Sequence, residues 1–316
     1  MHLPRHAWAV ACSLLLALIL PTAAHATPCA AAPPPPTQDQ WKQWRAQAKD
    51  RGLLWRITKN GESSWLYGTV HAARPEWAVP GPAVNKALQA SDVLALELDP
   101  LDPAIQQRVG ALVSQHAGQM PPVMAARVRT LVEKACLPVT LVDAMHPMMV
   151  LTTVQTVELR RDGIYAEYGI DQALSGMARK LGKPVISMET PDGQLRALLG
   201  DDLTVNTIDV SDTLKEMEDG RSQKVTGELL AVWSRGDLKR LSDYRKWCDC
   251  VRTASERALL KRILDDRNGG LADTIDKLHS EGKHVFAAAG ALHLVGPTGL
   301  PTLLAARGYR VEFIQP

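Results

Sequence analysis

KHVFAAAGALHLVGPTGLPTLLAARGYRVEFI, residues 283–314, is the stretch of this chain that decides its fold. The apolar, small-residue run Val285–Ala289 is typical of a strand buried on both faces of a parallel sheet. His293 follows this strand within one turn, and Leu300–Leu304 has the apolar spacing of a short helix before the last strand, Tyr309–Ile314. In open α/β sheets, ligands bind beyond the carboxyl ends of the strands, which is where His293 is expected to lie.

The pattern Gly-x-x-His occurs twice, each time directly after an apolar strand run. Gly68-Thr69-Val70-His71 is the first copy, and Gly290-Ala291-Leu292-His293 is the second. A glycine three residues before each histidine allows the backbone to turn sharply and a ligand to approach closely. The repeated pattern therefore suggests two related halves, and it makes Gly68 and Gly290 candidate substrate-binding positions.

The remaining pattern predicts a single α/β domain, residues 41–316, with a mixed central sheet and a helical insertion. Leu53–Thr58 and Ser63–Gly68 flank Asn60-Gly61, a strong signal for a two-residue hairpin turn. Further strands are expected at Asp92–Leu98, Val139–Val142 and Pro184–Met188. Helical spacing of apolar residues recurs within residues 80–90, 104–113, 122–135, 170–181 and 195–233.

The charge balance excludes some classes of partner. The 316 residues include 36 basic and 34 acidic side chains, for a net charge of +2. Because no basic excess is present to neutralise phosphates, we expect neither a nucleic acid nor a membrane surface as partner.

The N-terminus has the features of an export signal. A basic residue precedes the apolar run Ala7–Leu20, and Ala24-His25-Ala26 supplies the small residues that a signal peptidase requires. The run is short for a membrane span. We therefore expect residues 1–26 to be a cleaved signal peptide and residues 27–40 to be a proline-rich, extended linker, with the mature chain periplasmic or secreted.

Four cysteines remain after this cleavage: Cys29, Cys136, Cys248 and Cys250. An even number in an exported chain favours disulfides. A bond between Cys248 and Cys250 would be strained, so links from these two to Cys29 and Cys136 are favoured. A metal site at Cys-x-Cys is the alternative, although no second close cysteine pair or flanking histidine supports it.

His71, Glu97 and His293 form the best candidate catalytic set. Two imidazoles and a carboxylate at strand ends can hold a divalent metal ion and leave one position open for water, as catalytic zinc sites do. Glu97 lies in an apolar strand run, where a carboxylate needs a metal, an arginine or backbone N–H groups as partner. The alternatives are a salt bridge for Glu97 and a purely structural role for both histidines.

Three other polar residues are candidates for lining the same site. Glu189 ends the expected strand Pro184–Met188, so the same two roles are open to it as to Glu97. Arg267 and Asn268 could bind a carboxylate or a substrate carbonyl. The alternative for this pair is a helix cap with a surface ion pair to Asp265 or Asp266. Serine-hydrolase, nucleotide and dinucleotide motifs are absent from the sequence.

In their order and spacing these motifs resemble the TraB/GumN family, also called Tiki-like, over about Leu53–Ile314. The resemblance rests on Leu66-Tyr67-Gly68-Thr69-Val70-His71, Leu96-Glu97-Leu98-Asp99, Gly169-Ile170-Asp171, Glu189-Thr190 with Gln194, Ala231-Val232-Trp233 with Gly236-Asp237, Asp266-Arg267-Asn268 and Gly290-Ala291-Leu292-His293. The sequence departs from the family pattern at Asp266, where Glu is usual, and at Gly269-Gly270.

The resemblance implies a Tiki-like or erythromycin-esterase-like fold and a metal-dependent hydrolase, since proteases are known among Tiki-like members. His71, Glu97 and His293 would be the metal and catalytic set, with Arg267 and Asn268 lining the site and a peptide or small molecule as substrate. Related folds include a macrolide esterase and a haem-binding lipoprotein. A non-enzymatic binding protein for haem, metal or a peptide signal is therefore the alternative, and a structural interaction module is a third.

Overall fold

The computed structural model describes residues 29–200 and 203–314 and confirms an α/β architecture with one mixed sheet. Its six strands lie in the order β4-β3-β5-β2-β1-β6. Their bounds are β1 Leu53–Lys59, β2 Glu62–Thr69, β3 Val93–Leu96, β4 Val185–Ser187, β5 Val285–Gly290 and β6 Arg310–Ile314. The predicted signal segment, residues 1–26, lies outside the described residues.

Four adjacent strands run parallel and set the position of the candidate site. β2 and β3 both pair in parallel with β5, and β4 pairs in parallel with β3. β1 is antiparallel to both of its neighbours, β2 and β6. Asn60 and Gly61 join β1 to β2 with φ of 55° and 85°, as a two-residue type I′ turn requires. The predicted hairpin is confirmed, and the carboxyl ends of β4, β3, β5 and β2 meet at one edge.

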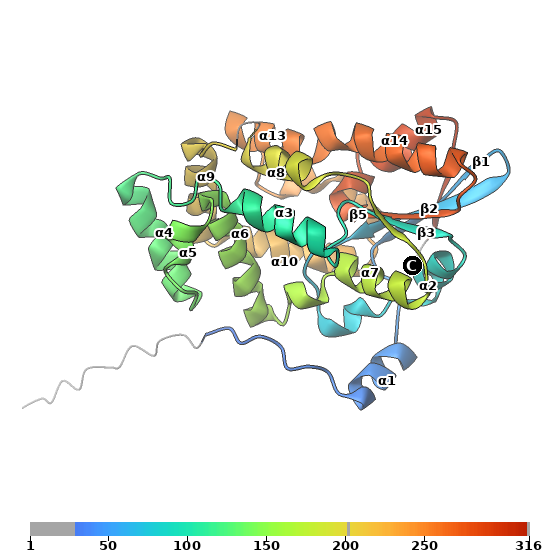
Figure 1. Cartoon of the computed structure of the whole chain (residues 1–316), viewed down its shortest axis with the longest axis horizontal. Helices are drawn as coiled ribbons and strands as arrows, with labels where there is room; N and C mark the ends of the chain where they lie inside the picture. The colour runs from blue at the N-terminus through green and yellow to red at the C-terminus, as the bar shows by residue number, and fades with distance from the viewer. Residues whose placement is uncertain (1–28, 201–202, 315–316) are drawn as a thin grey trace, which may run out of the picture.

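Apolar side chains cover both faces of the sheet, as the uninterrupted run in β5 predicted. Val285 and Ala287 belong to one core cluster, while Phe286 and Ala288 belong to the other. One face packs against α14 (Asp266–Ser280) and α15 (Leu300–Ala306). The opposite face packs against α2 (Pro82–Gln89), α7 (Ile170–Lys180) and α10 (Arg221–Ser234) (Figure 1). The sheet is therefore the middle layer of three.

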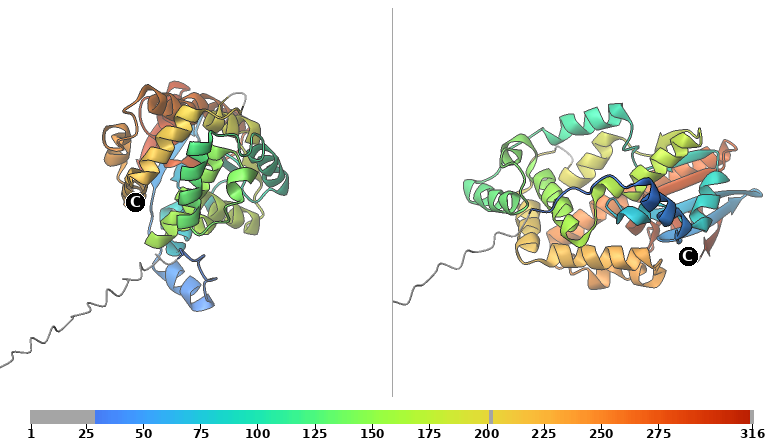
Figure 2. Two further views of the ribbon diagram at one scale, coloured as in Figure 1. Left: turned by 90° about the vertical axis from the view of Figure 1, so that its left-hand side faces the viewer. Right: turned by 90° about the horizontal axis from the view of Figure 1, so that it is seen from below.

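A helical part with its own apolar core lies at the far end of the molecule from the β1–β2 hairpin (Figures 1 and 2). It contains α3 Pro103–Val113, α4 Pro122–Lys134, α5 Leu141–Ala144, α6 Pro147–Glu158, α8 Pro191–Leu199 and α9 Thr207–Glu218. These helices follow β3 and β4, in agreement with the predicted helical insertion. The larger division into two related halves remains a prediction.

The strand predicted at Val139–Val142 is wrong. The N–H groups of Leu141 and Val142 donate to the carbonyls of Pro138 and Val139 at 3.0 and 3.1 Å, which closes a turn that leads into α5. Val142 is buried in the helical part, whereas Val139 is 42% exposed. A run of only four residues shows no period, so local spacing did not distinguish the turn from a strand.

The remaining elements are short and connect the larger ones. They are α11 Leu238–Ser242, α12 Tyr244–Trp247, α13 Ala254–Leu260, the π-helix η4 Lys261–Asp265 and the 3₁₀ turns η1 Pro75–Ala78, η2 Leu159–Asp162, η3 Ala166–Tyr168 and η5 Ala291–Leu294. Helix α1, Gln38–Ala46, begins inside the predicted linker and buries none of its residues. Across the described ranges, no helix is long and apolar enough to cross a membrane.

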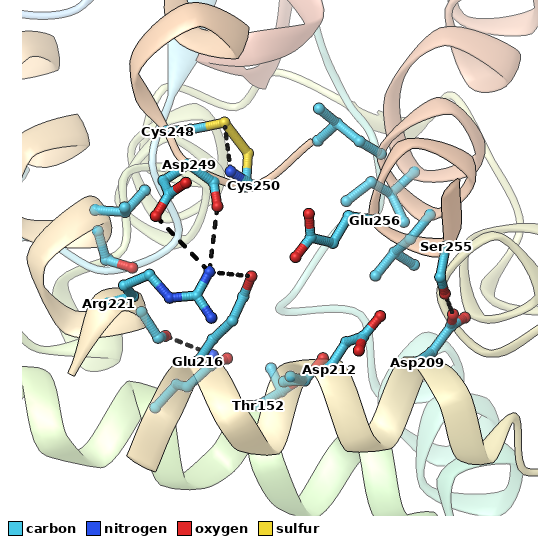
Figure 3. Close-up of a pocket in the computed structure, with 18 of the residues that line it drawn as sticks. Thr152, Asp209, Asp212, Glu216, Arg221, Cys248, Asp249, Cys250, Ser255 and Glu256 are labelled. Atoms are coloured by element: carbon cyan, nitrogen blue, oxygen red, sulfur yellow. Dashed lines mark hydrogen bonds and ion pairs between the residues drawn. A yellow bond between two sulfur atoms is a disulfide. The ribbon is translucent and has the colours of Figure 1, made fainter. Parts of the chain in front are cut away.

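The disulfides differ from the favoured pairing. Cys29 is bonded to Cys136, and Cys248 is bonded to Cys250 (Figure 3). Asp249 makes the second bond possible because its backbone takes the left-handed conformation, with φ of 51°, and brings its two neighbours together. The sequence disfavours this bond as strained, and in the structure the unfavourable backbone conformation is confined to Asp249. The Cys-x-Cys sequence forms a disulfide here.

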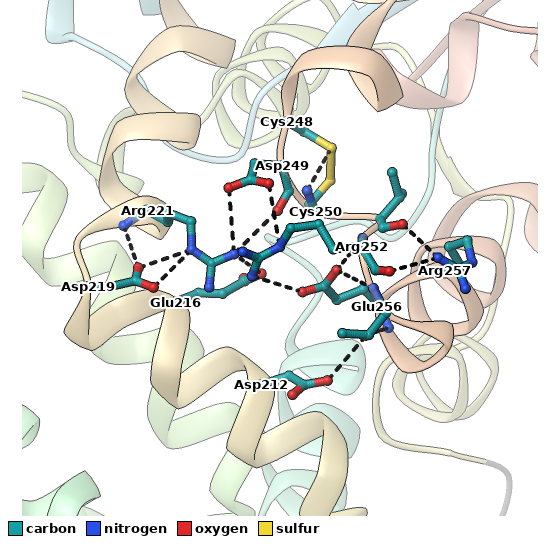
Figure 4. Close-up of polar contacts among 12 residues, drawn as sticks. Asp212, Glu216, Asp219, Arg221, Cys248, Asp249, Cys250, Arg252, Glu256 and Arg257 are labelled. Carbon is teal, nitrogen blue, oxygen red and sulfur yellow. Dashed lines mark hydrogen bonds and ion pairs between the residues drawn. A yellow bond between two sulfur atoms is a disulfide. The ribbon is translucent and has the colours of Figure 1, made fainter.

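Beside this disulfide lies a cavity of about 290 Å³, into which several carboxylates point (Figure 3). Glu216 on α9 faces Glu256 across it (Figure 4). Burial is the main cause that raises the pKa of Glu216 to about 7, and Glu256 adds to it although Arg221 opposes it. The folded state therefore retains a proton, between pH 4.5 and about 7, that the unfolded chain has released.

We expect the free energy of unfolding of the wild type to fall as the pH rises from 4.5 to about 7. The variant Glu216→Gln has no carboxyl group at this position, so its free energy of unfolding should not show this decrease. Above pH 7, Glu216→Gln should be more stable than the wild type by on the order of 1–2 kcal/mol, with no gain near pH 4. Urea denaturation between pH 4 and 8 measures the difference. Glu133→Gln, at an exposed position on α4, is the control that should follow the wild type at every pH. A gain that does not depend on pH would contradict the prediction.

Candidate active site

Four predicted site residues follow the four parallel strands. Glu97 comes directly after β3, His71 and Glu189 come two residues after β2 and β4, and His293 lies in η5, directly after β5. Because the carboxyl ends of these strands share one edge of the sheet, the structure brings together side chains that are up to 222 positions apart in sequence.

The predicted catalytic side chains surround Gly290. A methyl group added at Gly290 would lie 3.5 Å from Glu97 Oε1, 3.6 Å from His293 Cδ2 and 3.9 Å from His71 Nε2. One small volume is thus bordered by all three. Any larger residue at position 290 would occupy it.

Glu97 is 5% exposed, and both of its carboxylate oxygens accept hydrogen bonds. The Gly290 N–H donates to Oε1 at 2.7 Å, and Gln194 Nε2 donates to Oε2 at 3.2 Å. Arg267 Nη2 also donates to Oε2. Burial opposes ionisation, but His293, His71, Arg267 and the Gly290 N–H outweigh it and lower the pKa of Glu97 to about 2. The group is a carboxylate at neutral pH.

His71 lies on the open side of the site, with 72% of its side chain exposed. Its Nδ1 is 2.8 Å from Asp171 Oδ2, and the Thr69 hydroxyl donates to Asp171 Oδ1 at 2.7 Å. Asp171 raises the pKa of His71 to about 9. The Asp171 carboxylate accepts from Nδ1–H on one edge of the ring. The opposite edge, with Nε2, faces Gly290.

Asp171 reaches His71 because Gly169 lies against the end of β2. A methyl group at Gly169 would stand only 2.5 Å from the His71 carbonyl oxygen. The next residue, Ile170, donates its N–H to the Val70 carbonyl at 2.9 Å. This close contact starts α7 beside the first Gly-x-x-His loop and places Asp171 next to the ring.

His293 is 3% exposed and fixed from behind. Asn268 Nδ2 donates to the Thr298 carbonyl at 2.8 Å, so its Oδ1 accepts from His293 Nδ1–H at 2.5 Å. The Nε2 lone pair therefore points into the site. Burial lowers the pKa of His293 to about 4, which keeps the ring neutral. Asn268, predicted to bind substrate, holds this histidine in position through its Oδ1.

Arg267, in the first turn of α14, joins the two carboxylates to His293. Its Nε and Nη2 donate to Glu189 Oε1 and Oε2 at 3.0 and 2.6 Å, and Nη2 also donates to Glu97. Its Nη1 lies 2.8 Å from the Ile263 carbonyl and 3.2 Å from His293 Nε2. The side chain is 13% exposed, so the alternative of a surface ion pair with Asp265 or Asp266 is wrong. Glu189 forms a salt bridge with Arg267.

The nitrogen and oxygen donors of His71, His293 and Glu97 suit a divalent metal ion. Arg267, however, occupies contacts that such an ion would need. Each histidine has Nδ1 held by an oxygen, as in metal-ligating histidines, and presents Nε2 to the site beside the Glu97 carboxylate. The guanidinium, however, contacts both Glu97 Oε2 and His293 Nε2. Within the described residues, no group of three His, Cys, Asp or Glu side chains is gathered as a metal site. A metal ion would have to displace Nη1 and one Nη2 contact.

Two residues of the site were not among the predicted site residues. Asp171 orients His71, and Gln194, in α8, donates to Glu97. Both belong to sequence motifs on which the family resemblance rests, which is the signal that could have assigned them. Gly68, the other glycine predicted at the site, packs against the second Gly-x-x-His loop. Its carbonyl accepts from Trp233 Nε1 at 2.8 Å, and its Cα packs against Ala291.

Comparison with known proteins identifies the family to which most of the chain is similar. The family model described as TraB/PrgY/gumN matches residues 53–313, which include every residue of the site. An uncharacterized protein, YbaP, from Shigella flexneri is 23% identical over 253 residues, covering 76% of this chain and 87% of the relative. No solved structure was found to match the chain.

The two glycines of the Gly-x-x-His loops should respond differently to alanine. A methyl group at Gly68 would lie 3.1 and 3.2 Å from Ala291 Cα and Cβ, so Gly68→Ala should cost about 1–3 kcal/mol of unfolding free energy. Gly290 has φ of −48° and ψ of 136°, and its added methyl would make ordinary contacts. Gly290→Ala should stay within about 0.5 kcal/mol of the wild type. Urea denaturation measures both, and a larger loss for Gly290→Ala would contradict the assignment.

Proposed function

Because the chain belongs to the TraB/PrgY/gumN family, we propose that it is a hydrolase whose catalytic side chains are His71, Glu97 and His293. The observation that carries the proposal is the convergence of these three side chains on the space in front of Gly290. Their surroundings give each a different protonation state, with Glu97 charged, His293 neutral and His71 protonated. Titratable groups whose environments separate their pKa values in this way are typical of acid–base catalysis.

The roles follow from the contacts. Glu97 is fixed by the Gly290 N–H and accepts a proton from a water molecule in front of Gly290. Without a bound ion, His71, open to solvent and oriented by Asp171, donates a proton to the leaving group. With an ion bound at its Nε2, Glu97 would instead pass to the leaving group the proton that it accepted from water. Arg267 has its donors engaged by protein groups, and its fixed positive charge beside His293 favours negative charge that develops on the substrate carbonyl oxygen.

A divalent ion is part of the proposal. His71 Nε2, His293 Nε2 and Glu97 would hold it, and when bound it would lower the pKa of a water molecule and polarise the scissile carbonyl. Its binding would release the proton of His71 and would require Arg267 to retain Glu189 alone. We further propose that the chain is exported and that its substrate is a peptide or a small ester or amide.

Metal content of the purified protein tests the ion. We expect about one equivalent of a divalent ion per wild-type chain after incubation with zinc, manganese or cobalt. His71→Ala, Glu97→Gln and His293→Ala should each reduce it at least about tenfold, because each removes a ligand. His284→Ala is the matched control, since its imidazole contacts Glu62 at 2.8 Å, away from the site. A folded wild type that binds no ion would remove the metal from the proposal.

Hydrolysis of a quenched-fluorescent peptide library and of nitrophenyl esters tests the activity separately. Loss of His71 or His293 should lower turnover by about a hundredfold or more. Gly290→Ala should do the same with unchanged stability, because its methyl group occupies the space for water. Turnover that persists without bound ion would leave Arg267 as the electrophile. No turnover by the metal-loaded protein would overturn the proposal in favour of a binding protein for haem, metal or a peptide.

A further inference from the structure

A second cavity, of about 390 Å³, lies beside the histidine loop, where Leu292 and Val295 line it. Leu241, Leu264, Leu292 and Val295 provide most of its apolar wall. Its size lies within the range of small-molecule sites, which are mostly apolar with a few placed polar groups. None of His71, Glu97, Glu189 or Arg267 lines it, so it is distinct from the candidate active site.

The Arg245 guanidinium at this cavity has hydrogen-bond donors that are not paired with other described residues. Arg245, at the cavity edge, uses Nη2 to bind both carboxylate oxygens of Asp265 at 2.8 Å. Its Nε and Nη1 make no hydrogen bond to any residue within the described ranges, and the side chain is half-exposed. An apolar wall beside a guanidinium with free donors suits an apolar molecule that carries a carboxylate.

A continuous chain of hydrogen bonds leads from Arg245 to the candidate catalytic histidine. Asp265 Oδ1, bound by Arg245, also accepts from the Thr298 hydroxyl at 2.7 Å. The Thr298 carbonyl accepts from Asn268 Nδ2 at 2.8 Å, and Asn268 Oδ1 accepts from His293 Nδ1 at 2.5 Å. Asp265 and Thr298 themselves line the cavity. A carboxylate bound by the free donors of Arg245 lies next to Asp265 and repels it, and it therefore acts on the residues that orient His293.

We propose that this cavity binds a small apolar carboxylic acid, with its carboxylate on Arg245 and its chain against Leu264, Leu292 and Val295, and that binding shifts His293 through Asp265, Thr298 and Asn268. The binding site stands independently of hydrolysis. Only the consequence for activity rests on the proposed function, because it depends on the catalytic role of His293.

Isothermal titration calorimetry with octanoate, and with 1-octanol as the neutral analogue, tests the site. Octanoate should bind the metal-free wild type more tightly than octanol does. Arg245→Met keeps the apolar stem but removes the guanidinium, so it should weaken octanoate at least about tenfold and leave octanol nearly unchanged. Val295→Trp should weaken both ligands by filling the cavity. Arg310→Met, at a 67% exposed arginine in β6, is the control and should bind as the wild type does.

Nitrogen NMR of the histidine rings in the same titration tests the connection to His293. Octanoate should shift the His293 signals in the wild type and leave them unmoved in Val295→Trp, with His293→Asn identifying the signals. Absence of octanoate binding, or equal binding by folded Arg245→Met, would overturn the site. Binding that leaves the His293 signals unmoved would overturn the connection. Neither readout needs metal or turnover, so failure of the hydrolase proposal would leave these outcomes unaffected.

Discussion

The buried guanidinium of Arg267 is the interaction on which the arrangement of the site depends. It contacts Glu97 after β3, Glu189 after β4 and His293 after β5, so one side chain ties three strand ends to the start of α14. Two carboxylates this close together and this well buried would repel each other without it. Burying charges is costly, and the cost is offset only when hydrogen bonds satisfy nearly every donor and acceptor, as they do around Arg267.

The local sequence pattern was sufficient to predict the main strands of the sheet, because a turn or a buried strand is specified by a few neighbouring residues. Asn60-Gly61 predicted a hairpin turn, and the run Val285–Ala289 predicted a strand with both faces buried. The errors arose where tertiary contacts or a single backbone conformation decide. Val139–Val142 is too short for its periodicity to be read, and the bond between Cys248 and Cys250 depends on the left-handed backbone of Asp249.

For the site, sequence identified the side chains better than their partners. A polar residue that follows a parallel strand must lie at the carboxyl edge, so His71, Glu97 and His293 could be grouped without a structure. Arg267 and Glu97 are 170 positions apart, and Asp171 and His71 are 100 apart. No local pattern specifies such pairs, because the packing of α14 and α7 on the sheet determines them. The metal prediction therefore did not anticipate a guanidinium between the expected ligands.

Arg267 and a metal ion need not exclude each other, since the contacts of Arg267 divide into two groups. Its Nε and Nη2 donate to Glu189 at 3.0 and 2.6 Å, and its Nη1 also donates to the Ile263 carbonyl. These three hydrogen bonds do not involve the expected ligands. A cation in front of Gly290 would replace the positive charge that Glu97 loses, while Glu189 retains its arginine. On this argument, if the proposed metal ion binds, Glu189 would retain Arg267 and no carboxylate of the site would be left unpaired.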